Sequence, residues 1–514
     1  MANRSKNILG AGILLVSCIA TGVQAAPREE PNRPNILVFL MDDMGYGDLQ
    51  GTNPESKLSL PNLEKMAEQG MVFTDAHSPS AVCAPTRYSV LTGNYPWRGR
   101  NENGTWGFNH PSQILPGQET LAHVLNRAGY HNAFFGKMHL GGAVFDKTTG
   151  ERMTDWKIDF REIDFSRPLG EGLLGMGFDY AYALPNGIQG KPYAFFENDR
   201  LVSDPGKLVV WEKGHYGDSD IKASGFGAPD WDSSLAGPKL TEKALAFIDR
   251  HMEENKRIGK RRPFYMHYCS EACHTPHSPP DELLGTPVKG ASGISDHLDM
   301  IYEADVTLGK MVDRLRKAGE LNNTLIIFTS DNGGLSWGEA REKGHNSSAM
   351  LRGGKAQIWE GGHRVPFIAR WGDGTPDGSP IPPGTRNAQL IGLQDIYATL
   401  AELTGQSLEK DQGLDSQSFL KALRDPDLPP LRDHLYAQAN NEDVPGQRLM
   451  KMVRMGDWKL VTTREMKPVA LFNLGNDLSE KTNLLTHPEH QVRVQRMTKT
   501  LKQLMESERT TKPR

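Results

Sequence analysis

The sequence predicts an α/β protein with a large, mixed but mostly parallel sheet flanked by helices, followed by a smaller α+β domain. Between residues 33 and 405, short apolar runs alternate with helix-like segments, an order typical of parallel sheets. These runs are apolar at nearly every position, which suits strands buried on both faces. After residue 405 the pattern changes to proline-rich connections and short strand candidates. We therefore predict a large α/β domain over 33–405 and a smaller α+β domain over 406–514, with an antiparallel sheet and a terminal helix.

The elements follow from local patterns. Apolar runs predict strands over 34–40, 132–135, 263–268 and 324–329. Apolar spacing of three and four residues predicts helices over 61–70, 120–129 and 301–319, each ending at a glycine. Residues 145–235 are rich in Gly, Pro and Asp with little periodicity, which predicts long surface loops over one edge of the sheet. In the second domain, strand candidates near Leu435, Met452, Leu460 and Leu471 precede a helix from about His490 to Met505.

Composition limits the class of protein. The chain has 514 residues, of which 37% are hydrophobic and 24% are charged, so it can bury a large core and is neither disordered nor fibrous. Its 59 Lys and Arg against 63 Asp and Glu give a net charge of −4. This near balance argues against a nucleic-acid-binding protein that relies on bulk positive charge.

The first 25 residues have the three parts of a secretory signal. Arg4 and Lys6 precede an apolar run over 8–20, and small residues follow it. The run around Cys18 also fits a bacterial lipoprotein signal, so periplasmic, secreted and lipid-anchored fates stay open. No later run reaches the roughly 20 apolar residues that a membrane span needs.

Acidic pairs follow two of the predicted strands. Asp42 and Asp43 come directly after the first strand, and Asp331 and Asn332 come after the last. Ligands of open α/β sheets collect at the carboxyl ends of the strands. Together the two pairs therefore predict a metal site. Their hard oxygen ligands favour calcium or magnesium over zinc, and we expect one Ca²⁺.

A set of motifs identifies a family resemblance. Cys83-Ala84-Pro85-Thr86-Arg87 is followed in order by Gly136-Lys137-Met138-His139, Cys273-His274-Thr275-Pro276, Ser330-Asp331-Asn332-Gly333, and Leu351-Arg352-Gly353-Gly354-Lys355 with Glu360-Gly361-Gly362. The chain resembles the type I, formylglycine-dependent sulfatases of the alkaline phosphatase superfamily over about residues 33 to 484. Thr86 departs from the usual serine and keeps its hydroxyl.

The resemblance implies a function and a role for each motif residue. A maturation enzyme would oxidise Cys83 to formylglycine (3-oxoalanine), whose hydrate attacks the sulfur of a sulfate monoester. Residue 83 would also complete the metal site of Asp42, Asp43, Asp331 and Asn332. The remaining catalytic roles fall to five side chains: Arg87 stabilises the diol, Lys137 and Lys355 hold sulfate oxygens, His139 takes a proton from the diol, and His274 protonates the leaving oxygen.

The substrate is predicted less directly. Secretion, the long loops and nearby polar and aromatic residues suggest the sulfate ester of a polysaccharide or oligosaccharide. The candidate sugar-binding residues are Trp106, Trp337, His345, Arg352 and His363. Two alternatives stay open: a phosphonate monoester or phosphodiester hydrolase of the same superfamily, and an inactive carbohydrate-binding protein with unmodified Cys83.

Three cysteines remain after removal of the signal, namely Cys83, Cys269 and Cys273. An odd number means that at least one forms no intramolecular disulfide. A local bridge between Cys269 and Cys273 is one alternative, although an extended strand between them would hold them too far apart.

Overall fold

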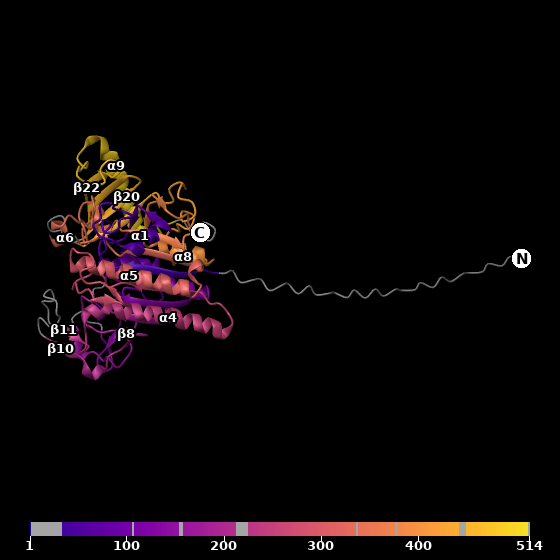
Figure 1. The fold of residues 1–514 in the computed structure, drawn as a ribbon. Helices are drawn as coiled ribbons and strands as arrows, with labels where there is room; N and C mark the ends of the chain where they lie inside the picture. Colours follow the sequence, from indigo (N-terminus) through magenta and orange to yellow (C-terminus); the bar gives the residue numbers. More distant parts are fainter. Residues whose placement is uncertain are drawn as a thin grey trace. The chain divides into compact units, whose positions relative to one another are not determined.

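The computed structural model describes residues 1, 33–104, 107–153, 158–211, 225–335, 338–375, 379–440 and 449–511. Pro34–Arg514 forms one compact unit (Figure 1), and the structure below is that of this unit. The predicted signal segment, Cys18, Trp106 and Trp337 lie outside the described residues. No helix in the described part of the chain is long and apolar enough to cross a membrane.

A ten-stranded mixed sheet forms the centre of this unit. Its strands, in spatial order, are β17 (Thr385–Asn387), β2 (Met71–Phe73), β16 (Phe367–Trp371), β15 (Thr324–Ser330), β1 (Asn35–Met41), β12 (Phe264–Cys269), β4 (His131–Lys137), β7 (Tyr180–Leu184), β8 (Phe196–Glu197) and β9 (Arg200–Leu201). The five strands from β15 to β7 run parallel to one another. The four predicted strands are among these five, and the predicted α/β class is confirmed.

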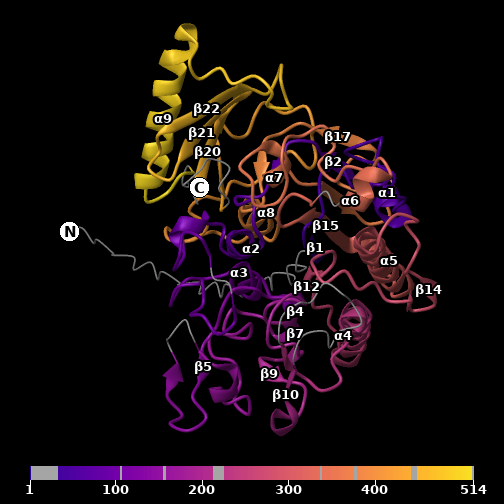
Figure 2. The same cartoon turned by 90° about the vertical axis from the view of Figure 1, so that its left-hand side faces the viewer.

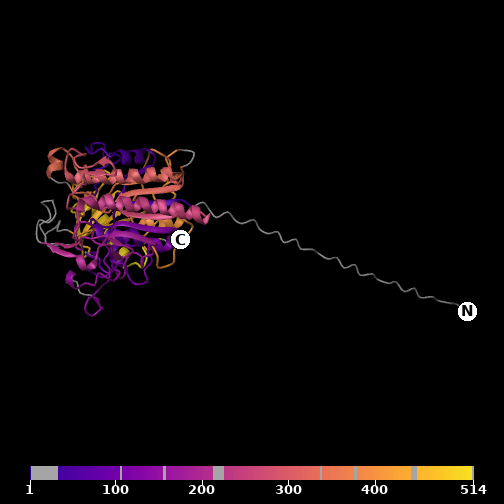
Figure 3. The same ribbon diagram turned by 60° about the horizontal axis from the view of Figure 1, so that its bottom comes forward.

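Helices cover both faces of the sheet. The described helices are α1 (Pro61–Glu68), α2 (Cys83–Thr92), α3 (Leu121–Arg127), α4 (Ala236–Ile258), α5 (Asp296–Lys317), α6 (Gly338–Glu342), α7 (Glu360–His363), α8 (Asp395–Leu403) and α9 (Gln491–Glu506). Side chains of β1 alternate between the faces: Ile36, Val38 and Leu40 pack with α2, α3 and α8, whereas Leu37, Phe39 and Met41 pack with α1, α4 and α5. Figure 2 shows α4 and α5 on one side of the strands and α2 and α3 on the other. The two longest helices, α4 and α5, lie side by side (Figure 3).

The C-terminal part forms a second, antiparallel sheet. Its strands in order are β19 (Leu435–Ala439), β20 (Met450–Met455), β21 (Trp458–Thr463) and β22 (Pro468–Asn473). One face packs on α9 through residues such as Val453 and Leu501. The other face packs on Ala81, Ile358 and Trp359. The C-terminal sheet therefore shares a core with segments that lie close to the motifs around Cys83 and Lys355.

The region over 145–235 holds more regular structure than the predicted loops. Strand β7 is a mostly buried member of the main sheet, so the expectation of loops alone was wrong. Its Tyr-Ala-Tyr-Ala-Leu sequence has small residues that weaken the apolar signal between flanking turns. Two pairs of short strands also form in or next to this region: β5 (Val144–Phe145) with β6 (Arg152–Met153), and β10 (Val209–Trp211) with β11 (Gly225–Gly227). Two further pairs form in other parts of the chain: β3 (Ala76–His77) with β18 (Ile391–Gly392), and β13 (Glu282–Leu283) with β14 (Thr286–Pro287).

Candidate active site

Four neighbouring parallel strands deliver the motif residues to one edge of the main sheet. The last residues of β1 and β15, Met41 and Ser330, are paired in register, so the acidic residues that follow them lie next to each other. Strand β12 leads to His274, and β4 ends at Lys137. The carboxyl ends of adjacent strands thus meet as the sequence predicts.

Cys83 is the first residue of α2. The preceding Val82 is extended, and Pro85 lies in the first turn, where its missing N–H costs no hydrogen bond. The Cys83 Sγ lies 3.2 Å from Nδ1 of His139. The hydroxyl of Thr86 donates to the carbonyl of Ser80 at 3.0 Å, so threonine preserves a contact that anchors the start of the helix.

Arg87 lies one helical turn after Cys83, as its spacing predicts. Its Nε and Nη2 donate to the same oxygen of Asp331, Oδ2, at 2.9 and 2.7 Å. Its Nη1 donates to the carbonyl of Lys137 at 2.9 Å. One buried guanidinium therefore connects α2, β15 and β4.

Two lysines contact the acidic residues after β1. Lys137 Nζ lies 2.6 Å from Asp42 Oδ2, and Lys355 Nζ lies 2.5 Å from Asp43 Oδ2. With Arg87, these cations balance the charges of Asp42, Asp43 and Asp331. A bound dication would give the cluster a net positive charge, which suits a sulfate anion.

The residues present fit a divalent metal with oxygen ligands. Oδ1 of Asp42 and Oδ1 of Asn332 are buried and have no hydrogen-bond partner among the described residues, which is a costly state unless a cation or ligand supplies the contact. Ligand atoms of Asp42, Cys83 and Asp331 lie within 4.8 Å of one another. Burial and neighbouring carboxylates raise the pKa of Asp331 to about 7, a penalty that a bound dication would remove.

The nucleophile position is not suited to act as a thiolate. Burial raises the pKa of the Cys83 thiol, despite the nearby lysines, so the unmodified residue is a neutral thiol and a weak nucleophile. Burial also lowers the pKa of His139 well below 6.5 and that of His274 to about 4. His274 Nε2 lies 3.8 Å from Asp43 Oδ2, on the same side of the cluster as Lys355.

Three of the predicted sugar-binding residues, His345, Arg352 and His363, lie in the described part of the chain, and each has contacts of its own. His345 is 1% exposed and its Nε2 lies 2.7 Å from Asp48 Oδ1. His363 is 0% exposed. Both side chains are buried, so the structure does not support their contact with substrate. Arg352 is exposed, but its guanidinium stacks on the Trp359 ring at 3.6 Å.

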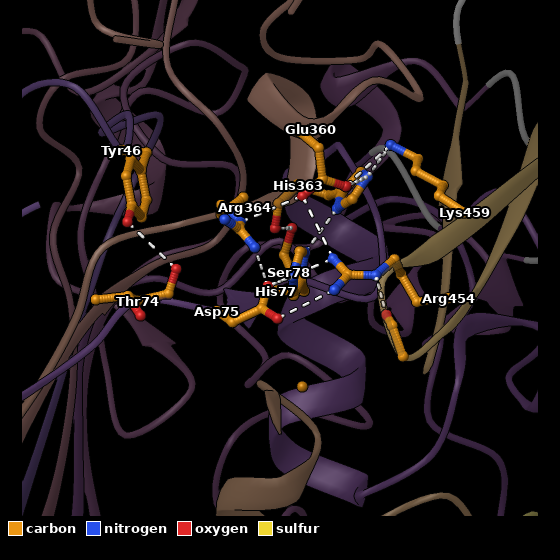
Figure 4. A network of polar contacts seen from close by, with 12 residues as sticks. Tyr46, Thr74, Asp75, His77, Ser78, Glu360, His363, Arg364, Arg454 and Lys459 are labelled. Carbon is orange, nitrogen blue, oxygen red and sulfur yellow. Dashed lines mark hydrogen bonds and ion pairs between the residues drawn. The ribbon is translucent and has the colours of Figure 1, made fainter. Parts of the chain in front are cut away.

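Sequence reasoning missed a second buried polar cluster close to the first. It joins His77, Glu360 and His363 to Lys459 of the C-terminal sheet (Figure 4). Glu360 was noted only as part of a motif, and Lys459 carries no local signal because it is an ordinary lysine in a short strand.

Comparison with known proteins defines the family. The Sulfatase family profile matches residues 34–406, and the chain therefore belongs to the Sulfatase family, which confirms the resemblance and makes the protein a sulfatase-family enzyme. An N-acetylgalactosamine-6-O-sulfatase of Bacteroides thetaiotaomicron is 29% identical over 97% of this chain and 98% of its own length.

Two further relatives agree with this assignment. The N-acetylgalactosamine-6-sulfatase of Canis lupus familiaris is 31% identical over 80% of this chain and 69% of its own length. A solved structure from work on the metabolism of multiple glycosaminoglycans by Bacteroides thetaiotaomicron is 27% identical, has a TM-score of 0.76, and is matched over 93% of this chain and 100% of its own.

Proposed function

We propose that this enzyme hydrolyses a sulfate ester on a sugar hydroxyl, with formylglycine at position 83 and one Ca²⁺ as its cofactors. The observation that carries the proposal is the grouping of Asp42 and Asp331 with residue 83, next to Asp43 and its partner Asn332. Three cations, Arg87, Lys137 and Lys355, pair with these carboxylates. Family members generally use formylglycine and a divalent metal. When both are present, the hydrated aldehyde supplies the attacking oxygen and the metal withdraws charge from the sulfate.

The side chains around residue 83 have complementary roles in this proposal. Lys137 and Lys355 offer ammonium groups for the sulfate oxygens, and the metal would take over their present carboxylate partners. His139, neutral and 3.2 Å from Sγ of residue 83, is positioned to accept a proton there. His274 lies on the outer side, is 16% exposed at its side chain, and would donate a proton to the leaving sugar oxygen.

A cavity lined by His277, which follows His274 closely in the sequence, offers room for the sugar beside the ester. It has a volume of about 620 Å³ and its wall includes His277, Ser278 and Trp231. His277 lies three positions after His274, so their Cα atoms are at most about 11 Å apart. Aromatic and polar groups together suit sugar rings. We propose this cavity as the place of a neighbouring sugar.

The named relatives suggest a first substrate. N-acetylgalactosamine 6-sulfate is the group in the names of two of them, and we propose it for this enzyme. We also propose export of the protein, on the basis of the predicted signal over residues 1–25, and modification of Cys83 by a maturation enzyme.

The test is release of inorganic sulfate by protein that was co-expressed with a maturation enzyme. We expect turnover of N-acetylgalactosamine 6-sulfate and its oligosaccharides, and loss of turnover in Cys83→Ala. Turnover of phosphonate esters but of no sulfated sugar would contradict the proposal, and so would a fully modified, metal-loaded enzyme that only binds sugars.

A further inference from the structure

A chain of hydrogen bonds runs from the C-terminal sheet to the segment that leads into the nucleophile helix (Figure 4). Lys459 Nζ of β21 lies 3.1 Å from His363 Nε2 of α7. His363 Nδ1 lies 2.9 Å from His77 Nδ1 of β3. His77 Nε2 lies 2.7 Å from Asp75 Oδ1. Lys459, His363 and His77 are each 0% exposed, so water does not compete for these bonds.

The chemistry of the groups fixes the direction of every bond. A carboxylate can only accept, so His77 carries its proton on Nε2 and its Nδ1 is an acceptor. His363 must then donate from Nδ1. The ammonium of Lys459 can only donate, so His363 Nε2 accepts from it at 3.1 Å. The Ile358 carbonyl also lies 3.2 Å from this nitrogen, and in this tautomer it receives no proton from the ring. Burial lowers the pKa of His77 and His363, in agreement with two neutral rings of defined tautomer.

Charges around the chain are balanced. Asp75 pairs with Arg364 and Arg454, and Lys459 lies between Glu360 at 3.1 Å and Glu480 at 2.8 Å. Three carboxylates thus face three cations. The side chains of His77, Glu360 and His363 could together hold a metal, but the Lys459 ammonium contacts both Glu360 and His363 and already supplies the positive charge there.

Main-chain hydrogen bonds connect this cluster to the segment that precedes Cys83. Ser78 N donates to the His363 carbonyl at 2.8 Å, and Ala81 N donates to the Gln438 carbonyl at 2.8 Å. Gln438 belongs to β19, the edge strand of the C-terminal sheet. The segment directly before Cys83 is thus held by α7 and by the C-terminal sheet.

Another main-chain hydrogen bond connects the cluster to the predicted metal ligand Asn332. Gly333, next to Asn332, donates its N–H to the carbonyl of Gly362 in α7 at 2.9 Å. A Cβ on Gly333 would lie 1.8 Å from the Gly361 carbonyl oxygen. The position of α7 therefore also determines the position of the Asn332 loop.

We propose that Lys459 is a positioning residue for sulfate ester hydrolysis. Through His363 and His77 it holds α7 and the Ser78–Val82 segment, and thereby sets residue 83 against Asn332. The proposal goes beyond the assigned roles of the motif residues and makes the C-terminal sheet part of the catalytic machinery. Because a misplacement of about 1 Å can cost 100-fold in rate, loss of this support should lower kcat more than it changes KM.

The experiment uses two variants. Lys459→Met removes the charge and leaves Glu360 and Glu480 short of a partner, so it can fail to fold. Lys459→Met/Glu480→Gln removes one cation and one anion and keeps the balance. The control is Arg261→Met/Glu320→Gln, which also removes one ion pair, with a separation of 2.9 Å. These two residues come just before β12 and β15 begin, so they lie at the opposite end of these strands from the active site.

Two readouts separate positioning from general stability. The first is kcat and KM, normalised to the formylglycine content of residue 83 by mass spectrometry; we expect kcat of the balanced variant to fall at least tenfold with KM within threefold, and the control to be unchanged. The second is hydrogen exchange of the Ala81 and Gly333 amides below the unfolding temperature, which we expect to accelerate at least tenfold in the same variant.

The exchange readout does not depend on the substrate, so it decides the inference even if the proposed sugar sulfate is not turned over. Wild-type exchange at Ala81 and Gly333 in the balanced variant would overturn the proposal. Wild-type kcat per formylglycine would also overturn it.

Discussion

Arg87 binds a single oxygen of Asp331 with two of its nitrogens, Nε at 2.9 Å and Nη2 at 2.7 Å. This arrangement joins the nucleophile helix to the acidic residue that follows β15, and the other oxygen of Asp331, Oδ1, accepts from the Asp43 N–H at 3.3 Å. The pair is buried, with side-chain exposures of 2% and 0%. Its geometry depends on the planar guanidinium.

Replacement of Arg87 by lysine should therefore be severe. We expect Arg87→Lys to lower kcat about 100-fold or more and the free energy of unfolding by about 2–4 kcal/mol, because Asp331 loses one of the two bonds that it accepts from residue 87 in a buried site. Steady-state kinetics and chemical denaturation check both. Arg257→Lys, in an exposed pair with Glu254, should match wild type. An active, stable Arg87→Lys enzyme would show that the two-nitrogen contact is not needed.

Gly333 should tolerate no side chain. A Cβ there would lie 1.8 Å from the Gly361 carbonyl oxygen, so Gly333→Ala must push the Asn332 loop away from α7. We expect Ca²⁺ affinity, measured by titration calorimetry, to fall at least tenfold. Gly338→Ala meets nothing within 4 Å and serves as the control. Equal affinities in the two variants would argue against a ligand role for Asn332.

Glu303 gives a pH-dependent prediction away from the metal ligands. Burial, with the charge of Glu271, raises the pKa of Glu303 well above 4.5. A group with a raised folded pKa destabilises the fold as pH rises above its unfolded pKa. Glutamine resembles the protonated form, so Glu303→Gln should add about 1–3 kcal/mol to the free energy of unfolding at pH 8 and little at pH 4.

Urea denaturation of wild type, Glu303→Gln and the exposed-site control Glu253→Gln at both pH values checks this. The control should show no pH-dependent gain. A gain of equal size at pH 4 and pH 8 for Glu303→Gln would mean that packing, and not ionisation, causes it.

The cavity lined by His277 predicts a preference among sugars. Its wall includes Asp232, Asp281, Glu282 and Asp296 against one lysine, Lys289. A uronic acid or a second sulfate placed there would be repelled. We expect kcat/KM for a sulfated disaccharide with a neutral neighbouring sugar to exceed that for its uronate counterpart about tenfold, with the ratio falling at high salt.

Reversing the charge of two acidic residues in the cavity wall tests whether the neighbouring sugar binds there. Asp281→Lys/Glu282→Lys should reduce this ratio. Glu253→Lys should not, because α4 begins at Ala236, directly after the cavity residue Leu235, and Glu253 lies about 26 Å along the helix from that start. A ratio that stays the same in the double variant would place the neighbouring sugar elsewhere, while turnover of the monosaccharide sulfate would still support the proposed reaction.

Much of the site could be predicted from sequence because its residues follow strands that are easy to recognise. The apolar runs of β1 and β15 locate Asp42 and Asp331, and parallel pairing brings them together. Helix α4 was not among the predicted elements, although Leu240, Ala244, Leu245 and Ile248 are buried on one side of it with helical spacing.

The His363–Lys459 contact could not be predicted. The two residues are 96 positions apart in the sequence, one in α7 and the other in β21. No local sequence pattern distinguishes a buried histidine from one that binds a sugar. His345 shows the same limit, since only the fold reveals that Asp48 accepts its hydrogen bond. The sequence also left open whether Cys269 and Cys273 form a disulfide. Both are free thiols in the structure.

Mass spectrometry of the peptide that carries residue 83, combined with sulfate release by the same sample, tests the central claim most directly. We predict that protein from a host with the maturation enzyme carries an aldehyde or its hydrate at position 83, and that sulfate release rises in proportion to that fraction. Sulfate release from protein in which residue 83 is entirely an unmodified cysteine would contradict the account.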